Sequence, residues 1–262
     1  MAPTRQFRAA DILALAVAVA LLGIFVVVHF PQLLTASRST LASAGATVGF
    51  AFLARQTRGV NLSGALAGSA IAFILAASEI RMFLMLLTVF ALTWGATRLG
   101  SRRKQQLRIA EVSEGRSASQ VVANLGVAGL LTAVAPAGWT VLVLAALAEA
   151  AADTSSSEVG MAFNGKTLLI TTWKPVPRGV DGGISLHGTF AGLAAATAVA
   201  VAGRLCGLIP PHYIAVVIYS GFLGTLVDSL LGAWLEQRGR LNNDLVNLLS
   251  TASAAGIAWV VM

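Results

Sequence analysis

Residues 149–189 read EAAADTSSSEVGMAFNGKTLLITTWKPVPRGVDGGISLHGT and form the longest polar interruption in a very apolar chain. They hold four acids, three cations and the glycine-rich turn RGVDGG. A charged side chain at the centre of a bilayer costs roughly 2.5 to 3.5 kcal/mol on insertion scales. Charges gathered at the ends of membrane helices therefore indicate a functional site.

The composition outside this stretch sets the class of protein. Of the 262 residues, 56% are hydrophobic and 11% are charged, whereas soluble domains carry about 25% charged residues. The chain is therefore predicted to be an integral membrane protein. Its net charge of +7 comes from basic residues in short loops between apolar segments. That placement favours a membrane-orientation signal over a nucleic-acid partner.

Apolar segments follow one another along the whole chain, each near the roughly 20 residues that span about 30 Å of hydrocarbon. Their approximate limits are 11–29, 39–54, 61–78, 80–98, 119–135, 138–153, 187–205, 212–234 and 246–262. We predict an all-α fold, a polytopic integral membrane helical bundle with about nine transmembrane helices (eight to ten), forming a single membrane domain over residues 1–262. The third and sixth segments are the candidates for half-helices or re-entrant segments.

The distribution of Lys and Arg predicts the orientation of this bundle. With nine crossings and a cytoplasmic N terminus, all Lys and Arg residues except Arg38, Arg81 and Arg204 fall on the cytoplasmic side. The polar loops would then share that side and form the site; they are 97–118, 153–186 and 235–245. We therefore expect an inner or plasma membrane protein with a cytoplasmic active site.

Small residues are expected to set the helix packing, since lipid tails are as apolar as leucine. Four Gly-x-x-x-Gly motifs permit close backbone approach and are interpreted as packing seams. They begin at Gly45, Gly64, Gly188 and Gly203.

Carboxylates at helix ends are the candidate metal ligands. Glu149 and Asp153 are four residues apart and share a face if the sixth segment is helical, and Asp228 lies inside the eighth segment near its cytoplasmic end. Carboxylates from different helices beside a basic loop suit Mg²⁺, which prefers a few oxygen ligands plus substrate phosphate. The alternative is a purely structural ion pair of Asp153 or Asp228 with Lys174 or Arg178.

The loop TTWKPVPRGVDGGIS, residues 171–185, is suited to binding phosphate. Its prolines fix the backbone and its glycines let the chain approach a ligand closely. Lys174 supplies a point charge and Arg178 a planar fork. A rigid, solvated turn is the alternative. The candidate phosphate-binding residues are Lys166, Thr172, Lys174, Arg178, Gly179, Gly182, Gly183 and Ser185.

Residues 160–167, GMAFNGKT, match the nucleotide-binding pattern G-x-x-x-x-G-K-[ST]. That pattern works where a strand delivers the loop and a helix follows it. Here a membrane helix is predicted before it, and poor helix formers come after it. We expect no P-loop fold, and Lys166 stays a candidate phosphate contact from a different backbone.

Several motifs together carry a resemblance to a known family. They are GRSASQVVANLG, ADTSSSEVG, LLITTWKPVPRGVDGGISLHGT, GTLVDSLLGAWLE and LNNDLVNLLS. The chain resembles, from about Asn61 onward, the polytopic membrane family that includes plant phytyl-phosphate kinase. More distantly it is similar to the CTP-using phosphatidate cytidylyltransferases, dolichol kinases and phytol kinases.

The resemblance implies Mg²⁺-dependent phosphoryl transfer from a nucleoside triphosphate, with CTP the expected donor, to an isoprenyl monophosphate such as phytyl or geranylgeranyl phosphate. It implies catalytic roles for Asp153, Lys174 and Asp228. The expected metal ligands are Asp153, Asp228 and Glu158. The expected substrate-binding residues are Asn61, Arg116, Gln120, Asn124, Asn243, Asp244 and Asn247; the asparagines near 243 could equally cap a helix.

Other functions use similar residues. A cytidylyltransferase that forms a CDP-lipid and an isoprenol or lipid kinase would need nearly the same site. A small-molecule transporter would predict matching inverted halves, and the sequence has no visible internal repeat. The expected partners are a nucleoside triphosphate, an isoprenyl phosphate and the bilayer, without nucleic acid; a homodimer is left open.

Overall fold

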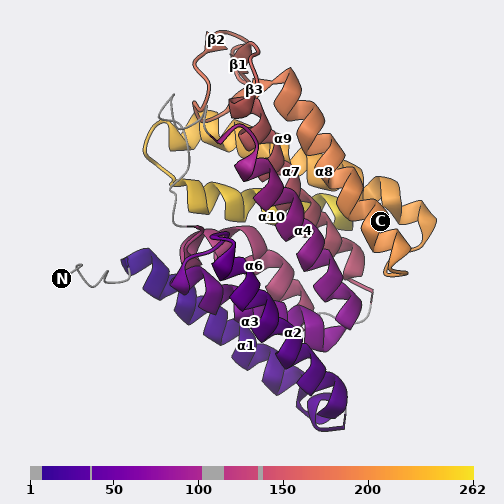
Figure 1. Cartoon of the computed structure of the whole chain (residues 1–262). Coiled ribbons are helices and arrows are strands. Elements are labelled where there is room, and N and C mark those ends of the chain that lie inside the picture. The colour runs from indigo at the N-terminus through magenta and orange to yellow at the C-terminus, as the bar shows by residue number, and fades with distance from the viewer. Residues whose placement is uncertain (1–7, 36, 102–114, 135–137) are drawn as a thin grey trace, which may run out of the picture.

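The computed structural model describes residues 8–35, 37–101, 115–134 and 138–262. Over these ranges the protein is a bundle of nine α-helices, as predicted for an integral membrane protein (Figure 1). The helices are α1 (Ala9–Thr35), α2 (Ser37–Gln56), α3 (Leu62–Ser78), α4 (Ile80–Arg98), α6 (Ala118–Val134), α7 (Thr140–Ala162), α8 (Leu186–Leu205), α9 (Ile214–Leu231) and α10 (Asn243–Val261). A 3₁₀ turn (Pro211–Tyr213) precedes α9, and a π-helical turn (Gly232–Glu236) follows it.

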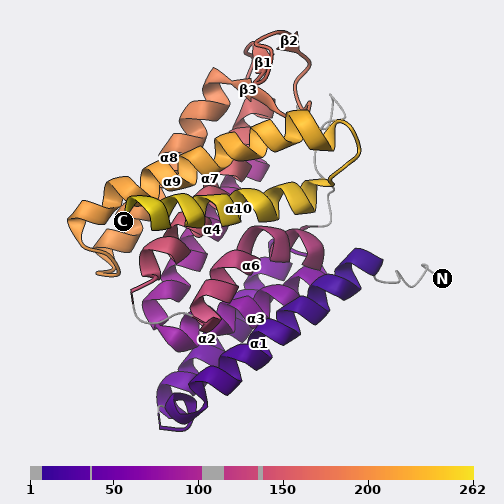
Figure 2. The same cartoon turned by 180° about the vertical axis from the view of Figure 1, so that it is seen from behind.

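Five stretches within the described ranges are long and apolar enough to cross a bilayer. They are Ala9–Leu33, Ile80–Arg98, Leu186–Leu205, Pro211–Glu236 and Asn243–Val261. Helices α3 and α6 are apolar but shorter, with 17 residues each. The start of α1 and the end of α10 lie on opposite sides of the molecule in both views (Figures 1 and 2).

Helix α7 forms the centre of the bundle. It packs against α4, α6, α8, α9 and α10, and every side chain from Val141 to Ala152 is buried. This half of the helix is rich in alanine, which lets neighbouring backbones come close. The remaining polar half of α7 is consequently held in a fixed position by the helices around it.

The sixth predicted segment, 138–153, ends too early. Helix α7 continues to Ala162, and Thr154 and Glu158 are buried within the bundle. Serine hydroxyls in this half donate to carbonyls of the preceding turn, so their polarity is satisfied without ending the helix. Helix α7 is thus a full 23-residue helix, and the predicted loop 153–186 is reduced to 163–185.

Three of the four glycine motifs lie at close contacts. An added Cβ would be 2.1 Å from the carbonyl oxygen of Arg116 at Gly64, and 2.6 Å from that of Ser156 at Gly188. At Gly203 it would meet a leucine side chain of α7 at 2.7 Å. These glycines are packing positions, as predicted.

The motif that begins at Gly45 behaves differently. Nothing lies within 4 Å of an added Cβ at Gly45 or Gly49, and Leu41 and Phe52 on the same helix are exposed. The predicted packing seam is therefore wrong for contacts among the described residues. This face of α2 is left open to its surroundings.

A small antiparallel sheet covers one end of the bundle, beside the end of α7 and the start of α8 (Figure 1). Its strands are β1 (Thr167–Leu169), β2 (Pro175–Val176) and β3 (Gly183–Ser185), in the order β2-β1-β3. The all-α prediction overlooked this sheet because strands of two or three residues carry no readable alternation.

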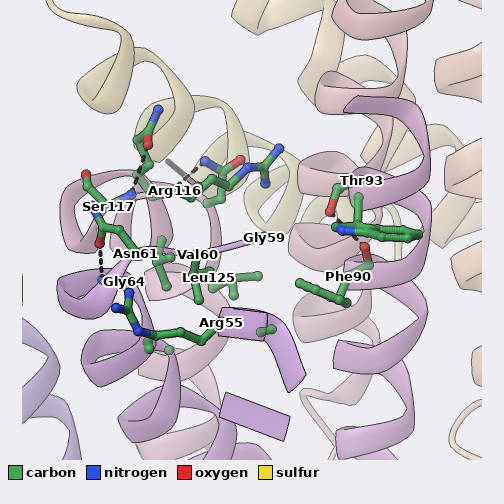
Figure 3. A pocket seen from close by; sticks show the side chains of 18 of the residues that line it. Arg55, Gly59, Val60, Asn61, Gly64, Phe90, Thr93, Arg116, Ser117 and Leu125 are labelled. Atoms are coloured by element: carbon green, nitrogen blue, oxygen red, sulfur yellow. Dashed lines mark hydrogen bonds between the residues drawn. The ribbon is translucent and has the colours of Figure 1, made fainter. Parts of the chain in front are cut away.

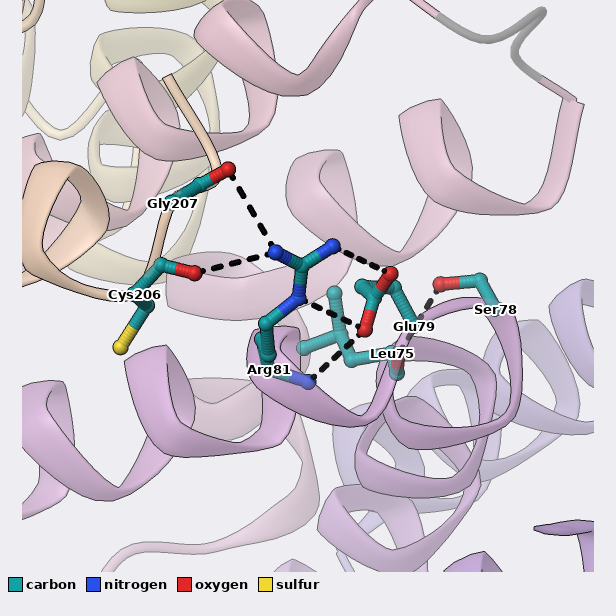
Figure 4. A network of polar contacts seen from close by, with 6 residues as sticks. All are labelled: Leu75, Ser78, Glu79, Arg81, Cys206 and Gly207. Atoms are coloured by element: carbon teal, nitrogen blue, oxygen red, sulfur yellow. Dashed lines mark hydrogen bonds and ion pairs between the residues drawn. The ribbon is translucent and has the colours of Figure 1, made fainter. Parts of the chain in front are cut away.

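A polar contact joins two loops, one at the start of α4 and one at the end of α8 (Figure 4). The Arg81 guanidinium forms an ion pair with Glu79 at 2.8 Å and donates to the carbonyl oxygen of Cys206 at 3.2 Å. The α3–α4 turn is thereby joined to the loop between α8 and α9.

Candidate functional site

A cavity of about 350 Å³ lies where the polar half of α7 meets α9, the loop before β3, and the first turns of α6, α8 and α10. It gathers most of the predicted site residues from separate parts of the chain. Those that line it are Arg116, Gln120, Asn124, Asp153, Glu158, Arg178, Gly179, Gly182, Gly183, Ser185, Asp228, Asn243 and Asn247. We call it the smaller cavity.

Two acids meet in the smaller cavity from different helices. Asp153 of α7 and Asp228 of α9 both line it, and their carboxylates are close enough to interact electrostatically. Asp228 Oδ2 is buried without a hydrogen-bond partner among the described residues. Glu149, one turn earlier on α7, is 1% exposed and packs against Gly224 outside the cavity lining. The wall of the cavity thus carries a pair of facing carboxylates.

This pair fits a magnesium ion that is shared with a substrate. No group of three His, Cys, Asp or Glu side chains that could hold a metal occurs in the described part of the chain. Glu158, which is 3% exposed, therefore does not complete a three-carboxylate site with Asp153 and Asp228. Mg²⁺ is commonly bound by one or two carboxylates plus substrate phosphates, and the unpaired Asp228 Oδ2 is a suitable ligand atom.

Two arginines border the same cavity. Arg178 donates through Nη2 to Asn164 Oδ1, while its Nη1 is buried and has no partner among the residues described. Arg116 donates through Nη2 to Thr154 Oγ1 at 3.1 Å. A guanidinium offers several donors in a planar fork that matches phosphate oxygens. Both arginines are placed to face an anion in the cavity.

The lining of the smaller cavity does not include three predicted phosphate-binding residues: Lys166, Thr172 and Lys174. All three are exposed, and Thr172 Oγ1 accepts a bond from the Lys174 amide at 3.4 Å. Thr172 and Lys174 lie on the turn between β1 and β2, and Lys166 directly precedes β1. The catalytic role expected for Lys174 therefore lacks a geometric basis in this conformation.

The P-loop pattern does not form its characteristic structure. Helix α7 ends at Ala162 and strand β1 begins at Thr167, so a helix precedes the loop and a strand follows it. This order is the reverse of a P-loop. The exclusion made from the sequence is confirmed.

Gly182 seats the glycine-rich loop on the end of α9. It has φ +75°, and an added Cβ would lie 2.5 Å from Ala233 Cβ and 2.6 Å from the Ser229 carbonyl oxygen. Gln237 Nε2 also donates to the Asp181 carbonyl oxygen at 2.6 Å. Only glycine accepts both this backbone conformation and this closeness, which explains the glycine at position 182.

Asp181, Ser229 and Glu236 line the smaller cavity but were not predicted as site residues. Partial burial raises the pKa of the Asp181 carboxyl above its usual range. Glu236 closes the π-helical turn Gly232–Glu236, a feature often found at functional sites. Asp181 lies in RGVDGG and Glu236 ends GTLVDSLLGAWLE. Both motifs were recognised in the sequence, but the sequence did not show that these two acids line the same cavity.

The asparagines near the start of α10 divide between two roles. Asn242 is the N-cap, accepting from the Leu245 amide at 2.9 Å, and Asn243 and Asn247 line the smaller cavity. Asp244 instead lines a second, larger cavity. The capping interpretation is thus correct for Asn242.

The larger cavity has a volume of about 890 Å³ and lies among α2, α3, α4 and α6 (Figure 3). Asn61 lines it and also caps α3, accepting from the Gly64 amide at 2.9 Å. In Figure 3, Phe90 of α4 lies across from Asn61. The two cavities share part of their lining, namely Arg116, Gln120, Asn124, Glu158 and Asn243.

Comparison with known proteins gives the family. Residues 45–255 match the model described as Integral membrane protein DUF92. The chain belongs to the DUF92 family. The match covers every segment that lines the smaller cavity, so that cavity lies wholly within the DUF92 region.

Named relatives come from bacteria, archaea and plants. The DUF92 chain is 36% identical over 187 residues to the Uncharacterized membrane protein sll0875 of Synechocystis, covering 68% of this chain and 72% of that protein. It is 32% identical over 225 residues to the Uncharacterized membrane protein MJ0933 of Methanocaldococcus jannaschii, covering 81% and 89%. No solved structure matches the chain.

A plant chloroplast protein also matches. The chain is 32% identical over 189 residues to Protein VTE6, chloroplastic, of Arabidopsis thaliana, which covers 67% of this chain and 57% of the plant protein. With the DUF92 match, this confirms the family resemblance predicted from the motifs.

Proposed function

We propose that this protein transfers the γ-phosphoryl group of a nucleoside triphosphate, with CTP the expected donor, to an isoprenyl monophosphate, and that the reaction depends on Mg²⁺. The observation that carries the proposal is the meeting of Asp153 and Asp228 with Arg178 and Arg116 around one cavity at a helix-bundle end. The motif resemblance to the family of plant phytyl-phosphate kinase supplies the substrate class.

Phosphoryl transfer asks a protein for positioning and charge neutralisation more than for covalent chemistry. Asp153 and Asp228 would hold the magnesium ion, which would offset the charge of the substrate phosphates. The free Nη1 of Arg178 would bind a phosphate oxygen of the donor. The glycines at 179, 182 and 183 let backbone approach the phosphates closely.

The acceptor phosphate would lie at the wall that both cavities share, beside Arg116 and Asn124. One of its oxygens attacks the γ-phosphorus, the bond from that phosphorus to the β–γ bridging oxygen breaks, and the nucleoside diphosphate leaves. An isoprenyl monophosphate is already ionised at neutral pH, so its attacking oxygen needs no general base. Fixed cations stabilise the charge that develops on the transferred group.

We also propose that this site faces the cytoplasm. The polar ends of α4, α7 and α9, the sheet, and the start of α10 lie together at one end of the bundle (Figures 1 and 2). Six Lys and Arg residues lie in or directly beside these segments, namely Arg98, Lys166, Lys174, Arg178, Arg238 and Arg240, and positive residues favour the cytoplasmic side.

The experiment uses purified protein with radiolabelled CTP, Mg²⁺ and geranylgeranyl or phytyl phosphate. Formation of the isoprenyl diphosphate and CDP is the expected result. Release of pyrophosphate with a CDP-lipid would show a cytidylyltransferase instead. Absence of either product with CTP, ATP, GTP and UTP would overturn the proposal.

A further inference from the structure

The larger cavity has the polarity of a site for an amphiphile. Arg98 and Arg55 lie at its charged end, whereas Leu86, Val89 and Phe90 of α4 line its depth. From Arg98 to Leu86 the cavity follows α4 for twelve residues, which is about 18 Å at 1.5 Å per residue. Its volume of about 890 Å³ is within the range of roughly 300 to 1,000 Å³ found for small-molecule sites.

The wall of this cavity includes the hydroxyl of Thr47. Thr47 of α2 is 5% exposed, and its Oγ1 has no hydrogen-bond partner in the described part of the chain. Buried hydroxyls are nearly always paired, so an unpaired one in a cavity wall indicates a missing occupant. Arg55 and Arg58 at the charged end likewise have no side-chain partner among the described residues.

Helices α1 and α2 both contribute to the lining of the larger cavity. Helices α1 and α2 are consecutive but make little contact with each other, since each packs on α3. Residues of both helices, among them Asp11 and Thr47, line the cavity. A chain entering from the membrane would pass between them, whereas a nucleotide would reach the smaller cavity from the water.

We propose that the larger cavity holds the isoprenyl chain of the acceptor, with the acceptor phosphate at the shared wall beside Arg116. This inference rests on the proposed function for the identity of the ligand. The geometry that carries it is the shared wall, because it puts the anionic head of an amphiphile in the larger cavity next to Asp153 and Asp228 in the smaller one.

The proposed occupant is a monophosphate with a single hydrocarbon chain. The arginines at the charged end favour an anionic head, and the apolar depth between α2 and α4 favours a hydrocarbon tail. A bilayer phospholipid such as phosphatidate shares this chemistry, so the experiment must separate the two.

The test is photolabelling of the full-length protein with a geranylgeranyl monophosphate analogue that carries a diazirine at the chain end, without nucleotide. We expect labelled peptides from α2 and α4, around Thr47 and Phe90. Excess unlabelled geranylgeranyl monophosphate should compete about tenfold better than phosphatidate or geranylgeraniol. Labels confined to α8 or α9, or equal competition by phosphatidate, would overturn the inference.

Variants provide the second readout. Ala51→Trp and Ala65→Trp add bulk at positions that line the larger cavity, and each should reduce labelling by about tenfold. The matched control is Val27→Trp, on a side chain of α1 that is 78% exposed, which should leave labelling unchanged. Unaltered labelling in both cavity variants, with the protein folded by size-exclusion chromatography, would contradict the inference.

Labelling and turnover fail independently. Correct labels in a protein that makes no diphosphate would reject the proposed function and keep the amphiphile site. Diphosphate formation with labels outside the larger cavity would reject this inference and keep the kinase.

Discussion

The carboxylate of Asp228 on α9 lies next to that of Asp153 on α7, and both border one cavity. Two like charges so close repel each other, and a divalent cation between them removes that repulsion. The Mg²⁺ and phosphate binding proposed above would use this pair of carboxylates.

Asp153→Asn and Asp228→Asn should each lower the rate of diphosphate formation by about 100-fold or more, because each removes a charged ligand from the metal. The protein should stay folded, and Mg²⁺ with nucleotide should raise its melting temperature less than in the wild type. Glu79→Gln, which removes an acid from the α3–α4 turn outside the site lining, is the control and should keep near-normal turnover. Wild-type rates in either aspartate variant would remove that residue from the metal site.

Arg178→Lys should raise the KM for the nucleotide by about 10- to 100-fold, since a lysine keeps the charge but loses the planar fork. Lys174→Ala should have a smaller effect, because Lys174 lies on the exposed β1–β2 turn. Steady-state kinetics at saturating acceptor would measure both. An equal loss in the two variants would mean that the hairpin turn reaches the donor when it binds.

Gly182→Ala should reduce turnover by about tenfold or more, because the methyl group would push the glycine-rich loop off the end of α9. Gly239→Ala is a matched control. Gly239 also has a positive φ, +67°, but nothing lies within 4 Å of an added Cβ. That variant should show only the backbone cost of about 1 to 2 kcal/mol as a lower melting temperature. Similar turnover in both variants would show that the contact with α9 is unimportant.

The ion pair of Glu79 and Arg81 predicts a small effect of pH on stability. The hydrogen bonds from Arg81 lower the pKa of the Glu79 carboxyl from its usual value of 4.5. The stabilisation is therefore present above about pH 4.5 and is lost as the pH falls through the lowered pKa. Both side chains are partly exposed, 46% for Arg81 and 38% for Glu79, so the loss of stability should be small. Thermal unfolding of wild type and Glu79→Gln across this range would check it; a difference that persists at low pH would contradict it.

Hydrophobic length predicted the helices well, since all nine apolar segments overlap a helix. It failed at the end of α7 because a buried Glu158 looks the same in sequence as an exposed one. The Gly-x-x-x-Gly spacing failed as a predictor of helix packing at Gly45, because the spacing of small residues does not tell whether a partner helix lies opposite. The very short strands of the sheet depend on contacts between Thr167 and Ser185, which no local pattern reveals.

The sequence predicted that Asp153 and Asp228 share a site, and both line the smaller cavity, although Asp153 lies inside α7 and not at its end. Residues close in sequence separate around β2: Arg178, after this strand, lines the smaller cavity, whereas Lys174, before it, does not. The convergence of Asp181 and Glu236 needed the loop to sit on α9, a long-range contact that composition and spacing do not encode.

Helix α7 is enclosed along its first half by five neighbouring helices. These helices hold the polar half of α7 in a fixed position, where it borders the smaller cavity and, through Glu158, the larger cavity. Water-soluble and membrane-borne reactants would then approach the polar half of α7 by separate routes.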